Sequence, residues 1–143
     1  MTELETKHLL KKNNIRVTVR KVAILRAVFE SGCPVNADEL HARVSVYMPV
    51  DLATVYRTLN AFKKFGLVRE INDPTGVQYF EVAGDDNPSH AHFKCTECLK
   101  LFCLDCAASD VSAAVPDVGD DFDVQEIWVT MSGICRECKR RDG

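Results

Sequence analysis

The feature that most constrains this chain is a Cys-x-x-Cys unit that recurs in its second half. Two of these units flank a segment rich in strand-forming residues, and their cysteines are Cys95, Cys98, Cys135 and Cys138. Four thiolates at this spacing are typical of a tetrahedral zinc site. A third unit, CLDC, lies between the other two, so spacing alone leaves open which two units share the metal.

A chain of 143 residues, of which 46% are apolar, can bury one sizeable hydrophobic core or two small ones, and the metal-binding motifs favour two. No apolar run is long enough to span a membrane, and the opening MTELETKHLLKKNN lacks the apolar stretch of a signal peptide. We therefore expect a cytoplasmic protein with no membrane partner. In that reducing compartment, seven cysteines favour metal or redox chemistry over a disulfide framework.

Charge is distributed unevenly along the sequence. Residues 1–70 carry 12 Lys and Arg against 7 Asp and Glu, a balance of +5, whereas residues 71–143 carry 6 against 14, a balance of −8. A basic half joined to an acidic half is expected when only one half binds nucleic-acid phosphates. The same asymmetry also occurs in two-domain proteins that never bind DNA.

Capping residues and apolar periodicity predict four helices in the first half. Thr18 and Asn36 are suitable N-caps, and Gly32 follows the expected end of the second helix. The helices are predicted at 2–12, 18–31, 36–47 and 51–65, and Cys33-Pro34 is expected to be a linker. The last two helices would form a helix-turn-helix.

The stretch from Val50 to Gly66 is predicted to be a DNA-recognition helix, with Asp51 as its N-cap. One stripe is apolar and would face the core: Leu52, Val55, Leu59 and Phe62. The other side could read bases, since Arg pairs with guanine, Asn with adenine, and Ala or Tyr can meet the thymine methyl. The candidate DNA-binding residues are Ala53, Thr54, Tyr56, Arg57, Asn60 and Lys64. The alternative is an ordinary amphipathic surface helix.

Three more basic residues cluster near the start of the second helix: Arg16, Arg20 and Lys21. A helix N-terminus already favours phosphate, so these side chains are candidates for contacts to the DNA backbone. The alternative is that each is a solvated surface charge.

After Gly66, strands are predicted at 67–71 and 77–82, joined by an Asn-Asp-Pro-Thr-Gly turn. Helices followed by this hairpin make a winged helix-turn-helix domain, predicted over residues 1–82. The segment AGDDNPS is the expected hinge at 83–89, and a second domain is predicted at 90–143. The fold class is therefore α+β.

The second domain is predicted to be a small α/β unit with a thin apolar core. HAHFKCTECLKLFCLDC predicts a strand, a knuckle and a strand; a short helix at 105–114, a loop at 116–121 and an alternating strand at 122–131 follow. So small a sheet needs a metal, a partner chain, or both.

The combination of DLATVYRTLNAFKKFGLV, HAHFKCTEC and GICREC resembles the Fur (ferric uptake regulator) family of metal-responsive bacterial repressors. The match runs over nearly the whole chain. The resemblance implies that the first and last Cys-x-x-Cys units hold structural Zn²⁺, which selects Cys95, Cys98, Cys135 and Cys138. It also implies that the second domain mediates dimerisation.

The resemblance further implies a regulatory metal site between the domains. Carried over by position, its ligands would be Glu81, His90, His92 and Cys103, with Cys33 as a fifth candidate. The spacing of the two histidines places both on one face of a strand, which favours ligands over unrelated surface histidines. Family sites for Fe²⁺ or Mn²⁺ are rich in His and carboxylate, whereas thiolate ligands favour Zn²⁺.

The sequence departs from the family pattern at several places. Leu99 follows Cys98 where Gly is usual, and Asp51 replaces a common Ser, which questions a phosphate contact there. Ser89, Ala91 and Ile127 lack the side chains that make a further metal site in some relatives, although Asp110 and Glu126 leave a weaker version open.

The leading hypothesis is a homodimeric, zinc-responsive repressor that binds a palindromic operator in double-stranded DNA and is not an enzyme. The first alternative is an iron-responsive or peroxide- or thiol-redox-responsive repressor of the same family. The second is a thiol redox sensor or enzyme that uses Cys103 and Cys106 with Cys33 as partner, although no helix start that would lower a thiol pKa is evident in the sequence. A zinc-stabilised interaction module is a third reading, which leaves the Arg57, Asn60 and Lys64 face unexplained.

Overall fold

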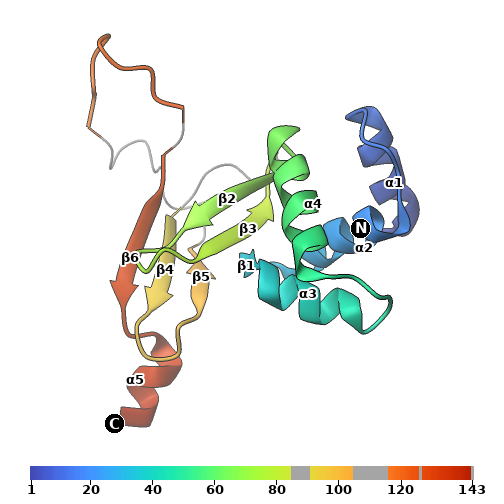
Figure 1. The fold of residues 1–143 in the computed structure, drawn as a ribbon. Coiled ribbons are helices and arrows are strands. Elements are labelled where there is room, and N and C mark those ends of the chain that lie inside the picture. The colour runs from blue at the N-terminus through green and yellow to red at the C-terminus, as the bar shows by residue number, and fades with distance from the viewer. Residues whose placement is uncertain (85–90, 105–115, 126, 143) are drawn as a thin grey trace. The chain divides into compact units, whose positions relative to one another are not determined.

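The computed structural model describes residues 1–84, 91–104, 116–125 and 127–142. The chain divides into two compact units, Met1–Asn87 and Pro88–Gly143, and each is described separately. Helices and sheets occur in both units, so the fold is α+β, as predicted (Figure 1).

The first unit contains all four predicted helices. They are α1 (Glu3–Lys12), α2 (Val19–Ser31), α3 (Ala37–Ser45) and α4 (Leu52–Lys64). Each begins after a residue whose side chain accepts a hydrogen bond from a backbone N–H of the first turn, which stabilises the helix start. Helix α3 ends at Ser45, earlier than predicted, and residues 46–48 form a turn.

The core of the first unit lies between these helices and the sheet, and its members are fully or nearly fully buried. The predicted stripe on α4 is confirmed for Val55, Leu59 and Phe62, all with no exposed surface, whereas Leu52 is only partly buried. Thr58 is also buried on this helix, which the apolar pattern did not reveal.

Three antiparallel strands complete the first unit in the order β1-β3-β2, with β1 at Val35–Asn36, β2 at Val68–Asn72 and β3 at Gln78–Val82. The hairpin was predicted and is confirmed. Its turn is fixed by Asp73, whose Oδ1 accepts hydrogen bonds from the backbone N–H groups of Thr75 and Val77 and from the Thr75 hydroxyl. Strand β1 follows the expected Cys33-Pro34 linker and was not predicted.

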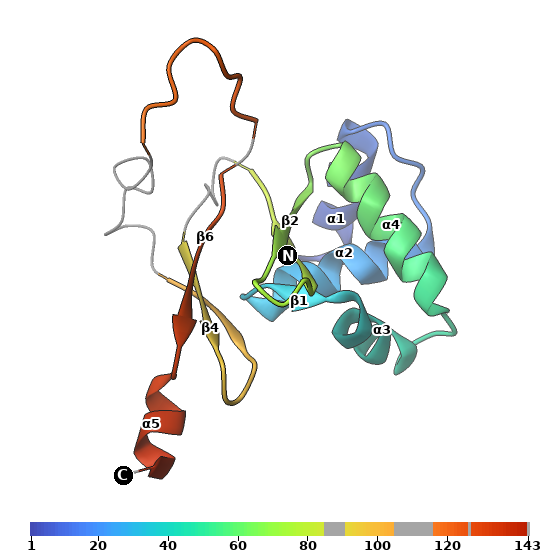
Figure 2. The same ribbon diagram turned by 60° about the vertical axis from the view of Figure 1, so that its left-hand side comes forward.

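The second unit has a sheet in the order β5-β4-β6, with β4 at Ala91–Cys95, β5 at Leu101–Cys103 and β6 at Val129–Gly133. Strand β5 is antiparallel to β4, as the predicted knuckle requires, and β6 is parallel to β4. Figure 2 shows β6 beside β4, with α5 (Arg136–Asp142) following it. Gly133 allows this approach, because a Cβ there would lie 3.1 Å from Cζ of Phe93.

The predicted strand at 122–131 is wrong in its first part, because β6 begins only at Val129. Phe122 and Val124 are 69% and 50% exposed and pair with no strand among the described residues. Alternation alone does not make a strand, since the backbone groups also need a hydrogen-bonding neighbour. The helix predicted at 105–114 lies outside the described residues. None of the described helices is long and apolar enough to cross a membrane.

Candidate metal and DNA-binding sites

Four cysteine sulfurs meet in the second unit. The Sγ atoms of Cys95 and Cys138 are 3.8 Å apart, as are those of Cys98 and Cys135, and all four lie within 4.8 Å of one another. A zinc ion bound to four thiolates at about 2.3 Å holds the sulfurs about 3.8 Å apart, at the corners of a tetrahedron. This four-cysteine cluster therefore fits zinc, and the first and last Cys-x-x-Cys units form it.

Two backbone N–H groups point at one of these sulfurs, one from the knuckle between β4 and β5 and one from the segment after β6. The N–H groups of Cys98 and Cys135 donate to Sγ of Cys95, at 3.5 Å and 3.3 Å. Burial acts to raise the pKa of Cys95, but the N–H groups of Cys135, Cys98 and Glu97 outweigh it and lower that pKa to about 6. The four-cysteine cluster thus contains a thiolate ready for metal at neutral pH.

The fourth ligand behaves in the opposite way. Burial, together with the neighbouring thiols of Cys135, Cys95 and Cys98, raises the pKa of Cys138 to about 12. A thiol of this kind loses its proton when a dication binds beside it.

The knuckle contains a strained residue at the position where the family pattern has Gly. Leu99 adopts a φ of +64°, in the left-handed region that non-glycine residues avoid, and its side chain is 60% exposed. Its N–H donates to the carbonyl of Cys95 at 3.0 Å, which closes the turn around the first two ligands. The metal loop is therefore formed at a local cost.

A second pair of metal-binding side chains lies across β4 and β5. His92 and Cys103 are direct partners in the antiparallel register, so an imidazole and a thiol stand side by side. Since side chains alternate along a strand, His92 and Cys95 point to opposite faces of β4. The His92–Cys103 pair is thus separate from the four-cysteine cluster.

Glu81 lies near the end of β3 in the first unit and is paired with Arg69 of β2. Nε of Arg69 donates to Oε1 of Glu81 at 2.7 Å, and the two side chains are 20% and 5% exposed. The two residues are register partners in the hairpin. The sequence pattern alone did not indicate this role for Arg69, because its pairing with Glu81 follows only from the hairpin register.

The other proposed regulatory ligands are less defined. Cys33 is exposed, in the short connection between α2 and β1, and its thiol belongs to no group of three or more potential ligands among the described residues. His90 lies outside the described residues, as do Cys106, Asp110 and Glu126. Their roles remain predictions.

The outer face of α4 is open to solvent. Its candidate base-reading residues are exposed, except for Thr54, which is half-buried: Ala53, Tyr56, Arg57, Asn60 and Lys64. Nη2 of Arg57 donates to Oγ1 of Thr54 at 3.2 Å. The N-cap is the other polar feature. Hydrogen bonds from Thr54 lower the pKa of Asp51, and the charges of Arg57 and Arg20 add to this. An acidic cap therefore stands at the start of this helix.

Two of the three basic residues near α2 also contact backbone carbonyls. Nε of Arg20 donates to the carbonyl of Pro49, and Nζ of Lys21 donates to the carbonyl of Arg16, both at 3.2 Å. Arg16 and Arg20 are exposed and Lys21 is half-buried.

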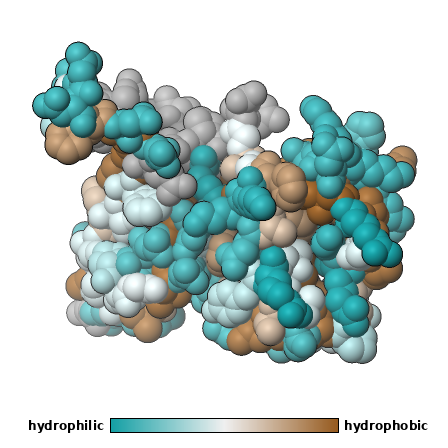
Figure 3. Space-filling view, turned by 45° about the horizontal axis from the view of Figure 1, so that its top comes forward, coloured by the Kyte–Doolittle hydropathy of each residue, from teal (hydrophilic) through white to brown (hydrophobic). Residues whose placement is uncertain are grey.

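On the face in Figure 3, hydrophilic side chains cover much of the surface, with apolar patches between them.

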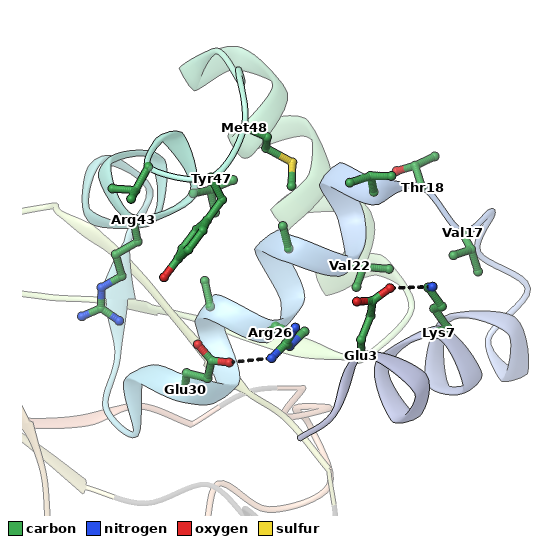
Figure 4. A pocket seen from close by; sticks show the side chains of 15 residues that line it. Glu3, Lys7, Val17, Thr18, Val22, Arg26, Glu30, Arg43, Tyr47 and Met48 are labelled. Atoms are coloured by element: carbon green, nitrogen blue, oxygen red, sulfur yellow. Dashed lines mark hydrogen bonds and ion pairs between the residues drawn. The ribbon is translucent and has the colours of Figure 1, made fainter.

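A groove of about 800 Å³ also lies in the first unit, lined by residues of α1, α2, α3 and the segments beside them. Figure 4 shows the Glu3–Lys7 and Arg26–Glu30 ion pairs among the residues that line it. Helix α4 contributes no residue to its lining. The groove is therefore separate from the candidate recognition face.

A family model named "Ferric uptake regulator family" matches residues 12–114, which include the helix-turn-helix, the hairpin and the first Cys-x-x-Cys unit. The chain belongs to the ferric uptake regulator family. It is accordingly a metal-responsive DNA-binding regulator.

Relatives within the ferric uptake regulator family differ in the signal named for them. The peroxide-responsive repressor PerR of Staphylococcus epidermidis is 29% identical over 131 residues, which cover 91% of this chain and 85% of that protein. The Helicobacter pylori ferric uptake regulator, described with three functional metal-binding sites, has a TM-score of 0.73 at 18% identity and covers 97% of this chain and 95% of its own. A zinc uptake regulator in complex with zinc and DNA has a TM-score of 0.65 at 19% identity, with 98% and 94% covered. These two structures confirm the fold.

Proposed function

We propose that this family member is a homodimeric repressor of the bacterial cytoplasm that binds a palindromic operator when a zinc ion occupies a site between its two units. The observation that carries the zinc assignment is the His92–Cys103 pair, because it joins nitrogen and sulfur ligands on adjacent strands. Zinc favours such ligands in four-coordinate geometry, whereas Mn²⁺ favours oxygen donors.

Operator recognition would use the outer face of α4. Its exposed Arg57 and Asn60 have the side chains that pair bidentately with guanine and adenine in the major groove. Arg16, Arg20, Lys21 and Lys64 would contact phosphates and set the register of the helix. In a two-fold dimer, two such helices would enter successive major grooves, which is why the operator is expected to be palindromic.

The regulatory site would be completed by Glu81 from the end of β3, with His90 and Cys33 as further candidates. Only residues 83–90 separate β3 from β4. Glu81 is therefore connected to the strand that carries His92 by a short segment of chain. A metal bound by ligands from both units would favour one inter-domain angle over others. If that angle matches the half-site spacing, metal binding raises operator affinity by population shift.

A peroxide- or iron-responsive repressor is the second candidate, and one observation favours it. Cys103 is exposed, so its thiol is accessible to oxidants. The S. epidermidis relative is named a peroxide-responsive repressor. Oxidation of Cys103 would remove a ligand and release the metal, which would lead to derepression through the same residues.

The test is a metal titration of protein whose four-cysteine cluster is already filled with zinc. A genomic fragment selected by gel shift is labelled, and its binding is followed by anisotropy as buffered Zn²⁺, Fe²⁺ or Mn²⁺ is added under reducing conditions. We expect zinc to activate binding at the lowest free concentration. Cys103→Ser should raise that concentration by more than about tenfold, because a ligand is lost.

Cys33→Ser, at an exposed cysteine of the first unit, tests the fifth candidate in the same way: an unchanged zinc concentration would remove Cys33 from the ligand set. Equal or stronger activation by Fe²⁺, with Cys103→Ser unchanged, would contradict the zinc assignment and favour the iron or peroxide regulator. Binding that never responds to metal would contradict the regulatory site altogether.

A further inference from the structure

The ion pair between Arg69 and Glu81 places a fixed positive charge on a proposed metal ligand. Nε of Arg69 is 2.7 Å from Oε1 of Glu81, and both side chains are largely shielded from solvent. Shielded pairs are screened less by salt than exposed ones. The carboxylate of Glu81 therefore already has a cationic partner within the hairpin.

This pair lies on the face of the hairpin opposite the helical core. Val68 and Phe80 pack into the core of the first unit, so their neighbours Arg69 and Glu81 point to the other face. A second ion pair lies on the hairpin's helical side, where Nζ of Lys63 contacts Oε2 of Glu70 at 2.6 Å. The hairpin thus carries two acid–base pairs, of which only one includes a proposed metal ligand.

We propose that Arg69 competes with the regulatory metal for the carboxylate of Glu81, and so sets the metal concentration at which the repressor responds. This inference rests on the proposed function, because it requires Glu81 to be a ligand. In the absence of regulatory metal, Arg69 holds Glu81. When the metal binds, the guanidinium gives up Oε1 and stays nearby as a like charge that weakens binding.

Arg69 has two opposing effects on the affinity of Glu81 for a metal, and the larger of the two decides whether the affinity rises or falls. The ion pair restricts the Glu81 rotamer, which would help a metal by ordering its ligand. A cation within about 4–6 Å of a carboxylate, however, lowers its affinity for a single proton by about 10- to 1000-fold. A dication carries twice the charge of a proton, so repulsion outweighs the benefit of ordering one side chain.

The experiment measures zinc affinity directly, by competition with a chelator, in protein whose four-cysteine cluster is filled. Arg69→Gln should bind the regulatory zinc at least about tenfold more tightly than wild type, since the opposing charge is gone. Arg69→Lys keeps the charge and should stay close to wild type. The matched control, Lys63→Gln, removes the same charge from the ion pair on the other face and should change affinity by less than about twofold.

Each outcome has a distinct meaning. Weaker zinc binding by Arg69→Gln would make Arg69 a positioning residue and overturn the competition, as would equal tightening by Lys63→Gln. If Glu81→Gln leaves zinc affinity unchanged, the proposed regulatory site itself has failed. In wild type, the NMR signal of the Arg69 Nε–H should shift and exchange faster with water when zinc is added. An unchanged signal in zinc-saturated protein would also contradict the exchange of partners.

Discussion

The two units of this protein have different kinds of core. The first unit has a core of Leu, Ile, Val and Phe side chains contributed by four helices and a hairpin. In the second unit, the core cluster that the described residues form consists of Cys95, Cys135 and Cys138, with Phe93, Cys98 and Phe102 packed against it. Apolar burial stabilises the first unit, whereas a metal bound to these sulfurs would add to the stability of the second.

Because of this difference, the structural metal and the regulatory metal are expected to affect different properties of the chain. Loss of the structural metal should act on folding and only in the second unit, while loss of the regulatory metal should act on the inter-domain angle. A protein built this way can report on a metal in the cell without unfolding each time that metal is scarce. The following predictions test how complete the separation is.

The largest effect is expected from removal of the structural metal. Stripping the four-cysteine cluster with a strong chelator, or replacing Cys138 by Ser, should unfold the second unit and abolish dimers. Amide hydrogen exchange should show loss of protection in β4 and β6, with α2 and α4 still protected. Cys103→Ser is the control and should keep the structural zinc. Loss of protection in both units together would contradict independent stabilisation.

The reverse experiment addresses the apolar core. Phe62 has no exposed surface, so Phe62→Ala should destabilise the first unit by roughly 3–5 kcal/mol through lost burial and a cavity. Trp128 is the single tryptophan and belongs to the second unit, so its fluorescence reports on that unit alone. The midpoint of urea unfolding followed by circular dichroism should move to a lower urea concentration. The Trp128 fluorescence transition and the zinc content should stay unchanged. A matching shift in both signals would show that the units unfold as one.

A smaller effect is expected at the proposed recognition face, without any change in folding. Arg57→Ala should weaken the free energy of operator binding by roughly 1–3 kcal/mol and reduce the discrimination between operator and other DNA sequences. Arg16→Ala should instead weaken binding to any sequence and reduce the salt dependence. Anisotropy with operator and scrambled DNA over a range of salt concentrations would measure both. If Arg57→Ala weakens specific and non-specific binding equally, it contacts phosphate rather than bases.

The knuckle offers a stabilising change confined to the second unit. Leu99→Gly should remove the left-handed strain, worth about 1–2 kcal/mol, against about 0.4–1 kcal/mol of added freedom in the unfolded chain. The net gain of up to about 1.6 kcal/mol should raise the Tm of the zinc-loaded second unit by a few degrees. Leu101, a buried residue with ordinary backbone geometry, is the control position, and Leu101→Gly should destabilise.

The smallest effect concerns the cap of the recognition helix. Because the folded state lowers the pKa of Asp51, its ionised form stabilises the helix above the carboxyl's ordinary pKa, and this contribution is lost as pH falls through the lowered value. Asp51→Asn keeps a capping side chain and removes the titration, so the acid limb of first-unit stability should flatten. Unfolding measured between about pH 2 and 6 would show it. An unchanged acid limb would mean that other carboxylates dominate.

The sequence predicted well those features that depend on near neighbours. Thr18, Asn36 and Asp51 each cap a helix within three residues, so their signals are local, and the Asp73 turn is equally local. The metal ligands were found because Cys-x-x-Cys spacing encodes a knuckle. Choosing among three units needed the family resemblance, which the sulfur geometry then supported.

Features that depend on distant partners were missed. Strand β1 exists only because Val35 and Asn36 pair with Phe80 and Tyr79 of β3. The parallel pairing of β6 with β4 joins residues nearly forty positions apart, for example Cys95 and Gly133, and no local pattern encodes it. Arg69 was overlooked for the same reason, because its partner Glu81 lies across the hairpin.

The parallel pairing of β4 and β6 also has a consequence for how the protein is made. The ribosome completes the whole core of the first unit, through Phe80, before it adds the first residue of β4. Domains fold as units during synthesis, earlier ones first. The first unit can therefore be folded on the nascent chain while Cys95 and Cys98 still await Cys135 and Cys138. A nascent chain arrested between these pairs would carry a folded first unit and a four-cysteine cluster with only two of its ligands.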